Sequence, residues 1–146
     1  LVKQAETNLT TLPNATVLCR SGTEAPLPQS DIIYVSAGAS EPMRAWLEAL
    51  APKGRLIFPL TPGRQYGGML LVTRLDIDSL YGARFVSRAA FIPCLGAQTD
   101  SMHASLAAAF DNGDWDTVRS LRAGSGKPDG TCWFAGDGWW LSTMDP

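Results

Sequence analysis

The sequence predicts an α/β domain in which part of a doubly wound parallel sheet ends in an antiparallel hairpin. Two aliphatic runs, 31–35 and 55–60, flank an amphipathic helical pattern, which is typical of parallel strands joined by a crossover helix. Strands this apolar predict a sheet covered by helices on both faces. Two further runs, Gly68–Arg74 and Ala83–Pro93, are separated only by a short polar loop, so they must pair antiparallel.

Composition sets limits on location and partners. The chain has 146 residues and 45% hydrophobic residues, enough for one domain with a core. Its 12 basic and 14 acidic residues nearly cancel, which gives no electrostatic case for nucleic acid or a membrane surface. We find no spanning-length apolar run and no secretion leader, and therefore expect a cytoplasmic protein. Cys19, Cys94 and Cys132 are expected to be buried free thiols.

Periodicity places the elements of the first two thirds of the chain. A helical pattern over 1–9 is followed by a buried strand at 15–19 and a second strand at 31–35. Pro42 suits the first turn of a helix. That helix carries one apolar face, formed by Met43, Trp46, Leu47 and Leu50. A third strand follows at 55–60, before the hairpin.

The C-terminal part is predicted to be a helical and aromatic appendage. A helix capped by Thr99 or Asp100 should end at Gly113, and a second short helix should start at Asp114. Their apolar faces would hold Met102, Leu106 and Phe110 in the first, and Trp115, Val118 and Leu121 in the second. Residues 132–134 and 139–141 flank a glycine-rich turn and predict a hairpin.

Four aromatic residues gather in that terminal hairpin. The favoured interpretation is that they pack the tail down onto the domain. The alternative is that their faces line a substrate mouth or a subunit interface. The residues are Trp133, Phe134, Trp139 and Trp140.

The stretch from Asp31 to Pro93 resembles the protein-L-isoaspartate O-methyltransferase family, which is built on a Rossmann-like methyltransferase sheet. Its residues 31–39, Asp-Ile-Ile-Tyr-Val-Ser-Ala-Gly-Ala, and 50–60, Leu-Ala-Pro-Lys-Gly-Arg-Leu-Ile-Phe-Pro-Leu, are similar to the family's fourth and fifth strands. The hairpin matches the family's closing hairpin in kind, and 8–17 look like the preceding helix and strand. The resemblance makes 1–97 the C-terminal part of a methyltransferase-like domain and leaves 98–146 as an extension packed on it.

The resemblance implies S-adenosyl-L-methionine as the cofactor and a carboxylate as the methyl acceptor, either an isoaspartyl peptide or a divergent small molecule. A carboxylate is ionised at neutral pH and needs no general base. The sulfonium is already an activated donor, so the protein has mainly to align the two. No catalytic residue is assigned for this reason.

Two loops are implied as contacts of the ligands. Ser21, Gly22 and Thr23 stand where the family has a G-D-G turn whose acid faces the adenine amino group; here Ser21 replaces the acid, which weakens the contact or moves it to Glu24. The run that leaves the next strand at its carboxyl end is a second candidate, because open sheets bind ligands there. Its assignments are cofactor for Ser36, Ala37 and Gly38, and substrate for Ala39 and Ser40. The competing interpretations are a loop held by glycine and tight helix–strand packing.

The resemblance also implies that the family's first strand and its glycine-rich cofactor turn are missing, so the chain alone is expected to be inactive. The strand at 32–35 would be central in such a sheet. Its unpaired edge then needs either an N-terminal half or another chain, which includes a homo-oligomer.

Other motifs carry little. Gly124-Ser125-Gly126-Lys127 lacks the preceding strand and following Ser or Thr of a phosphate loop. His103 is expected to be solvated, Asp76 and Asp78 to be ordinary turn residues, and no metal site is expected.

The sequence therefore predicts an S-adenosylmethionine-dependent O-methyltransferase. The alternative is a non-catalytic protein-binding module that keeps the fold. A nicotinamide-dependent oxidoreductase is disfavoured by the antiparallel hairpin.

Overall fold

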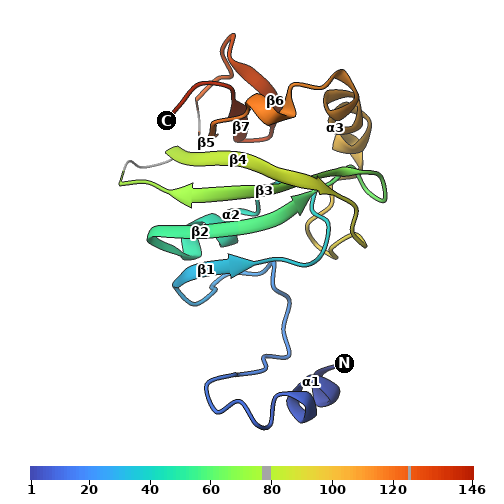
Figure 1. Cartoon of the computed structure of the whole chain (residues 1–146), viewed down its shortest axis with the longest axis vertical. Helices are drawn as coiled ribbons and strands as arrows, with labels where there is room; N and C mark the ends of the chain where they lie inside the picture. The colour runs from blue at the N-terminus through green and yellow to red at the C-terminus, as the bar shows by residue number, and fades with distance from the viewer. Residues whose placement is uncertain (77–79, 125) are drawn as a thin grey trace.

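A computed structural model describes residues 1–76, 80–124 and 126–146. Seven strands form one mixed sheet in the order β1-β2-β3-β4-β5-β7-β6 (Figure 1). Within these residues only β1 and β2 run parallel, and the other neighbouring pairs are antiparallel. The predicted α/β class is confirmed, but the sheet is mostly antiparallel rather than parallel.

The parallel unit has the predicted order of strand, helix and strand. It consists of β1 (Ser30–Tyr34), α2 (Arg44–Ala49) and β2 (Leu50–Leu60). The predicted helix face is confirmed, since Trp46, Leu47 and Leu50 are buried. The indole of Trp46 lies 5.6 Å from the ring of Phe58, which fixes the helix on the sheet.

The predicted antiparallel hairpin is also confirmed, as β3 (Gly67–Arg74) and β4 (Leu80–Ala89). The second strand ends at Ala89 rather than at Pro93. A bulge follows Met69, where the register shifts. Gly67 is required at the start of β3, because a Cβ atom there would overlap the carbonyl oxygen of Leu60.

The C-terminal extension begins with α3 (Asp100–Asn112), bounded by Thr99 and Gly113 as predicted. The predicted second helix is wrong beyond a single 3-10 turn, Trp115–Thr117. Val118 is extended, and Leu121 pairs with Tyr81 in β5 (Ser120–Ala123). The apolar positions of this segment are buried by strand pairing, which the helical spacing had hidden.

The extension is therefore part of the sheet. The predicted terminal hairpin is confirmed as β6 (Cys132–Gly136) and β7 (Trp139–Ser142). Strand β5 joins this hairpin to the main sheet, with β4 on one side and β7 on the other.

Helices α2 and α3 cover the same face of the sheet, which corrects the expectation of helices on both faces. Phe58 lies opposite Leu70, and Leu70 lies opposite Phe85, so the three side chains share a face. Trp46 of α2 packs on Phe58, and Phe110 of α3 packs on Phe85 at 5.4 Å. An antiparallel sheet can leave its other face in solvent, which a fully parallel one does not.

Three of the four aromatic residues of the terminal hairpin, Trp133, Phe134 and Trp139, pack on this covered face, as the favoured interpretation predicted. The ring of Trp133 lies 5.4 Å from Phe85 and 5.2 Å from Phe110, edge to face. Trp140 points to the opposite face, where Arg122 stacks on it at 5.1 Å.

The N-terminal segment lies away from the sheet (Figure 1). Helix α1 (Val2–Asn8) buries no residue. The predicted buried strand at 15–19 is wrong: the segment forms no strand and its Leu18 is 59% exposed. A short apolar run forms a strand only when a neighbour pairs with it, and none does here. None of the described helices is long and apolar enough to span a bilayer.

Candidate functional site

The first candidate site is a hollow of about 390 Å³ beside β1, called here the β1 hollow. It follows the strand to its carboxyl end, the position at which open α/β sheets bind ligands. Its walls are largely apolar and include Leu27, Ile33, Val35, Trp46 and Cys94.

Two of the predicted site residues meet at this hollow from different segments: Gly22 and Ser36 both line it. Gly22 is held there because its carbonyl oxygen accepts a hydrogen bond of 2.7 Å from the indole N–H of Trp46. Next to it, the hydroxyls of Ser21 and Thr23 are 2.8 Å apart and hydrogen-bonded to each other. The turn at 21–23 is thus a preformed element fixed to α2.

The remaining predicted site residues lie deeper. Gly38, Ala39 and Ser40 are buried, and Ala37 is half-buried. The backbone N–H of Ser40 donates to the carbonyl of Ala97 at 2.9 Å. Its hydroxyl oxygen accepts from the backbone N–H of Thr99 at 2.7 Å. These contacts match the competing interpretation of tight packing, while the assignment of Ala39 and Ser40 to substrate stays a prediction.

A hydrogen-bonded chain stands behind this segment. The side-chain amide of Gln98 donates to the carbonyl of Gly38 at 2.5 Å, and its oxygen lies 2.7 Å from Nε2 of His103. The NH2 group of Gln98 faces Gly38, so its oxygen faces His103. An amide oxygen can only accept, and Nε2 of His103 therefore carries a hydrogen. The expectation that His103 is solvated is therefore wrong: its side chain is half-buried and structural. Sequence reasoning missed this set of hydrogen bonds, since Gln98 and Gly38 lie 60 residues apart.

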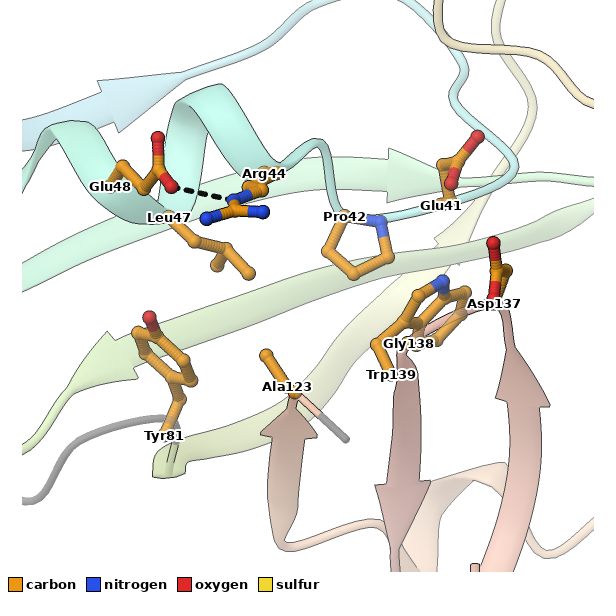
Figure 2. A pocket seen from close by; sticks show the side chains of 11 residues that line it. Glu41, Pro42, Arg44, Leu47, Glu48, Tyr81, Ala123, Asp137, Gly138 and Trp139 are labelled. Carbon is orange, nitrogen blue, oxygen red and sulfur yellow. Dashed lines mark hydrogen bonds and ion pairs between the residues drawn. The ribbon is translucent and has the colours of Figure 1, made fainter. Parts of the chain in front are cut away.

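A second hollow, of about 560 Å³, lies between α2 and the turn of the β6–β7 hairpin (Figure 2). We call it the Trp139 hollow. Its floor is formed by Leu47, Tyr81, Ala123 and Trp139, and charged side chains stand around its rim. The sequence pointed only to Trp139, through the alternative that the terminal aromatic residues line a substrate mouth, because the other walls come from separate parts of the chain.

The three cysteines are free thiols in different surroundings. Cys19 is exposed, contrary to the expectation of burial, and Cys94 and Cys132 are half-buried. Burial raises the pKa of the Cys94 thiol, and burial followed by the charge of Asp129 raises the pKa of Cys132. Both shifts lower the thiolate fraction at neutral pH.

Among the residues the structure describes, no group of three or more His, Cys, Asp or Glu side chains could hold a metal ion. Asp76 is exposed in its loop. Two sequence predictions, the turn role of Asp78 and the Gly124–Lys127 phosphate-loop likeness, fall on or across residues 77–79 and 125, which are outside the described ranges.

No protein-family model matches the sequence, and no curated protein matches it.

Proposed function

We propose that this chain is the C-terminal part of an S-adenosylmethionine-dependent O-methyltransferase domain, with a carboxylate as acceptor. The observation that supports this most is the meeting of Gly22 and Ser36 at the carboxyl end of β1. They come from the two loops that the family resemblance assigns to the cofactor. The order β1–α2–β2, followed by the β3–β4 hairpin, agrees with the same proposal.

The residues at the β1 hollow fit part of such a cofactor. A volume of about 390 Å³ lies within the usual range of roughly 300 to 1,000 Å³ for small-molecule sites. Its apolar walls suit an adenine ring, with Trp46 and Leu27 as the contacts. No carboxylate among the described lining residues could hold the ribose hydroxyls. That contact is assigned to protein outside this hollow.

When bound, the cofactor supplies a methyl group on a sulfonium that needs no further activation. The chain's own part is to position. The bond from the Trp46 indole keeps Gly22 at the mouth of the β1 hollow, and the small side chain of Ser36 leaves room for a ligand.

Calorimetry with S-adenosylhomocysteine tests the proposal, using this chain and the complete product of its gene. We expect the complete product to bind at micromolar strength or better. A Ser36→Trp variant should lower the affinity at least tenfold by filling the β1 hollow. Ser101→Trp, at an exposed position on α3, is the matched control and should bind as the parent does. If neither form of the protein binds, the cofactor assignment fails; if Ser36→Trp binds normally, the hollow is not the site.

A second candidate function is a binding module without catalysis, and the state of β1 favours it. In the described part of the chain this strand pairs on one side only, with β2, and it leaves Ile32 61% and Tyr34 65% exposed. An open edge with apolar side chains can accept a strand from another chain. Such a module would not bind S-adenosylhomocysteine, so the same calorimetry separates the two functions.

A further inference from the structure

The Trp139 hollow combines an apolar floor with an excess of negative charge. Three carboxylates line it, those of Glu41, Glu48 and Asp137, against the single guanidinium of Arg44. Arg44 is already paired, since its Nε lies 2.6 Å from Oε1 of Glu48. In Figure 2 this pair stands at one end of the hollow, and Glu41 and Asp137 stand at the other. The second end therefore offers two carboxylates with no cation of the hollow's own beside them.

The Glu41 carboxylate and the backbone turn that carries Asp137 are both fixed by the fold. Glu41 Oε1 accepts a hydrogen bond of 2.8 Å from the hydroxyl of Thr99. Asp137 stands in a tight turn that Gly138 makes possible, with a φ of +71°. The two acids come from the start of the α2 segment and from the terminal hairpin, so only the folded chain brings them to one hollow.

A second observation, independent of the charges, concerns the wall. Trp139 is 5% exposed, and its indole Nε1 is a buried donor that has no acceptor among the residues the structure describes. Figure 2 draws this nitrogen on the edge of the ring that faces Pro42 and Glu41. Two other indoles that pack in or against the core, those of Trp46 and Trp133, both donate to backbone carbonyls. A buried donor without a partner is costly, and an acceptor brought by a ligand would remove that cost.

We propose that the Trp139 hollow binds a basic residue of a peptide, arginine or lysine. Its cation lies between the carboxylates of Glu41 and Asp137. The aliphatic part of the side chain packs on Leu47 and Trp139, as long basic side chains commonly do on apolar surface. Because the indole Nε1 of Trp139 is fully buried, a carbonyl of the peptide accepts from it after the ring turns toward the hollow. One ligand thus supplies the cation and the acceptor that the hollow lacks. The inference is independent of the methyltransferase proposal, because the two hollows share no lining residue.

Nuclear magnetic resonance tests this directly, with the indole N–H signals as reporters. The probes are three blocked tripeptides, Gly-Arg-Gly, Gly-norleucine-Gly and Gly-Glu-Gly, added to the protein. The Trp139 signal is assigned by its loss in a Trp139→Phe variant. We expect Gly-Arg-Gly to shift this signal strongly, while the signals of Trp46 and Trp133 stay in place because their donors are satisfied. Gly-Glu-Gly should leave all of them unchanged.

Charge variants complete the test. Asp137→Asn should weaken the binding of Gly-Arg-Gly by roughly two- to fivefold, the effect of an exposed ion pair, and added salt should weaken it in the parent protein. Asp111→Asn, at the exposed end of α3, is the matched control and should leave it unchanged. Equal shifts by the arginine and glutamate peptides, or unchanged binding in Asp137→Asn, would overturn the proposal. Binding of the norleucine peptide as tight as that of the arginine peptide would reduce the site to an apolar hollow and overturn it too.

Discussion

The two edges of the sheet end in different ways. At one edge, β6 carries a bulge between Cys132 and Phe134 and packs two of its aromatic rings onto the core. At the other, β1 has no bulge beyond its first residues and turns Ile32 and Tyr34 into solvent. Natural sheets usually protect an edge by a bulge, a charge or a cover. The β6 edge has such protection, and the β1 edge has only Asp31.

The difference shows where the fold is self-sufficient. The rings around Phe85, contributed by β4, β6, α3 and the turn at 115–117, contact one another edge to face. All of that cluster comes from residues 85–133. The β1 edge has no comparable set of contacts, and the N-terminal segment that precedes it buries little. We infer that stability is concentrated in the C-terminal two thirds of the sheet and that β1 is the place where another strand would add to it.

The largest expected effect is on stability. Phe85→Ala should lower the free energy of unfolding by about 3 to 5 kcal/mol, because it empties the centre of the aromatic cluster. Tyr34→Ala, at the open edge, should cost less than about 1 kcal/mol. Urea unfolding followed by circular dichroism measures both. A cost for Tyr34→Ala close to that for Phe85→Ala would mean that the β1 edge is covered in solution, and the contrast between the edges would disappear.

How far the sequence predicts this contrast depends on the range of the interactions involved. The α2 face and the β3–β4 hairpin were predictable, because residues three to twenty apart in the chain determine them. Strand β5 was not predictable, since the spacing of Leu121 from the apolar residues before it fits a helix face as well as a strand. What decides is its pairing with Tyr81, 40 residues earlier. The strand expected at 15–19 does not form for the same reason: strand formation depends on pairing, and no strand pairs with this segment in the described part of the chain.

The candidate sites divide in the same way. Ser36 was found from the sequence because its loop follows the recognisable strand β1, whereas the turn at 21–23 was found through the family resemblance, although the strand expected before it does not form. The Trp139 hollow was not found, because Glu41, Tyr81 and Asp137 come together only through the strand order β4-β5-β7. Residues 98–146 were predicted to be an appendage, so the sequence did not show that their strands form one wall of this hollow.

Self-association is the second test of the open edge. If β1 accepts a strand, two copies of this chain can pair through it, as the two-fold symmetry of most dimers allows. Ile32→Lys places a charge on that edge and should shift the protein toward the monomer in sedimentation velocity. Ala135→Lys, at an exposed position of β6, is the matched control and should not change the distribution. An unchanged distribution in both variants at high protein concentration would assign the open edge to a different partner or to none.

A third prediction concerns the reactivity of the thiols near the two edges. Cys19 is exposed in the N-terminal segment, while Cys132 lies half-buried in β6 with a raised pKa. The thiolate is the nucleophile, so Cys19 should react with iodoacetamide several-fold faster than Cys132 at pH 8. Cys94, whose pKa is also raised by burial, should be slow as well. Peptide mass spectrometry after timed quenching gives the order. Faster reaction at Cys132 would mean that the β6 edge opens in solution.

The smallest expected effect is the pH dependence of the turn that leads into β6. The hydroxyl and then the backbone N–H of Thr131 donate to Oδ1 of Asp129, at 2.5 and 2.8 Å, and these bonds lower the pKa of the Asp129 carboxyl. A lowered pKa in the folded state stabilises the fold above the ordinary aspartate pKa of about 3.9, and that contribution is lost as the pH falls through the folded-state value. Asp129→Asn should therefore be slightly less stable than the parent near pH 7, and the difference should vanish at pH 2. The matched control is Asp31→Asn in β1, because the Asp31 carboxylate makes no hydrogen bond in the described part of the chain. Urea midpoints across this pH range measure the difference. A gap between parent and Asp129→Asn that stays constant down to pH 2 would show that the carboxylate charge plays no part, and the β6 edge would then owe its protection to packing alone.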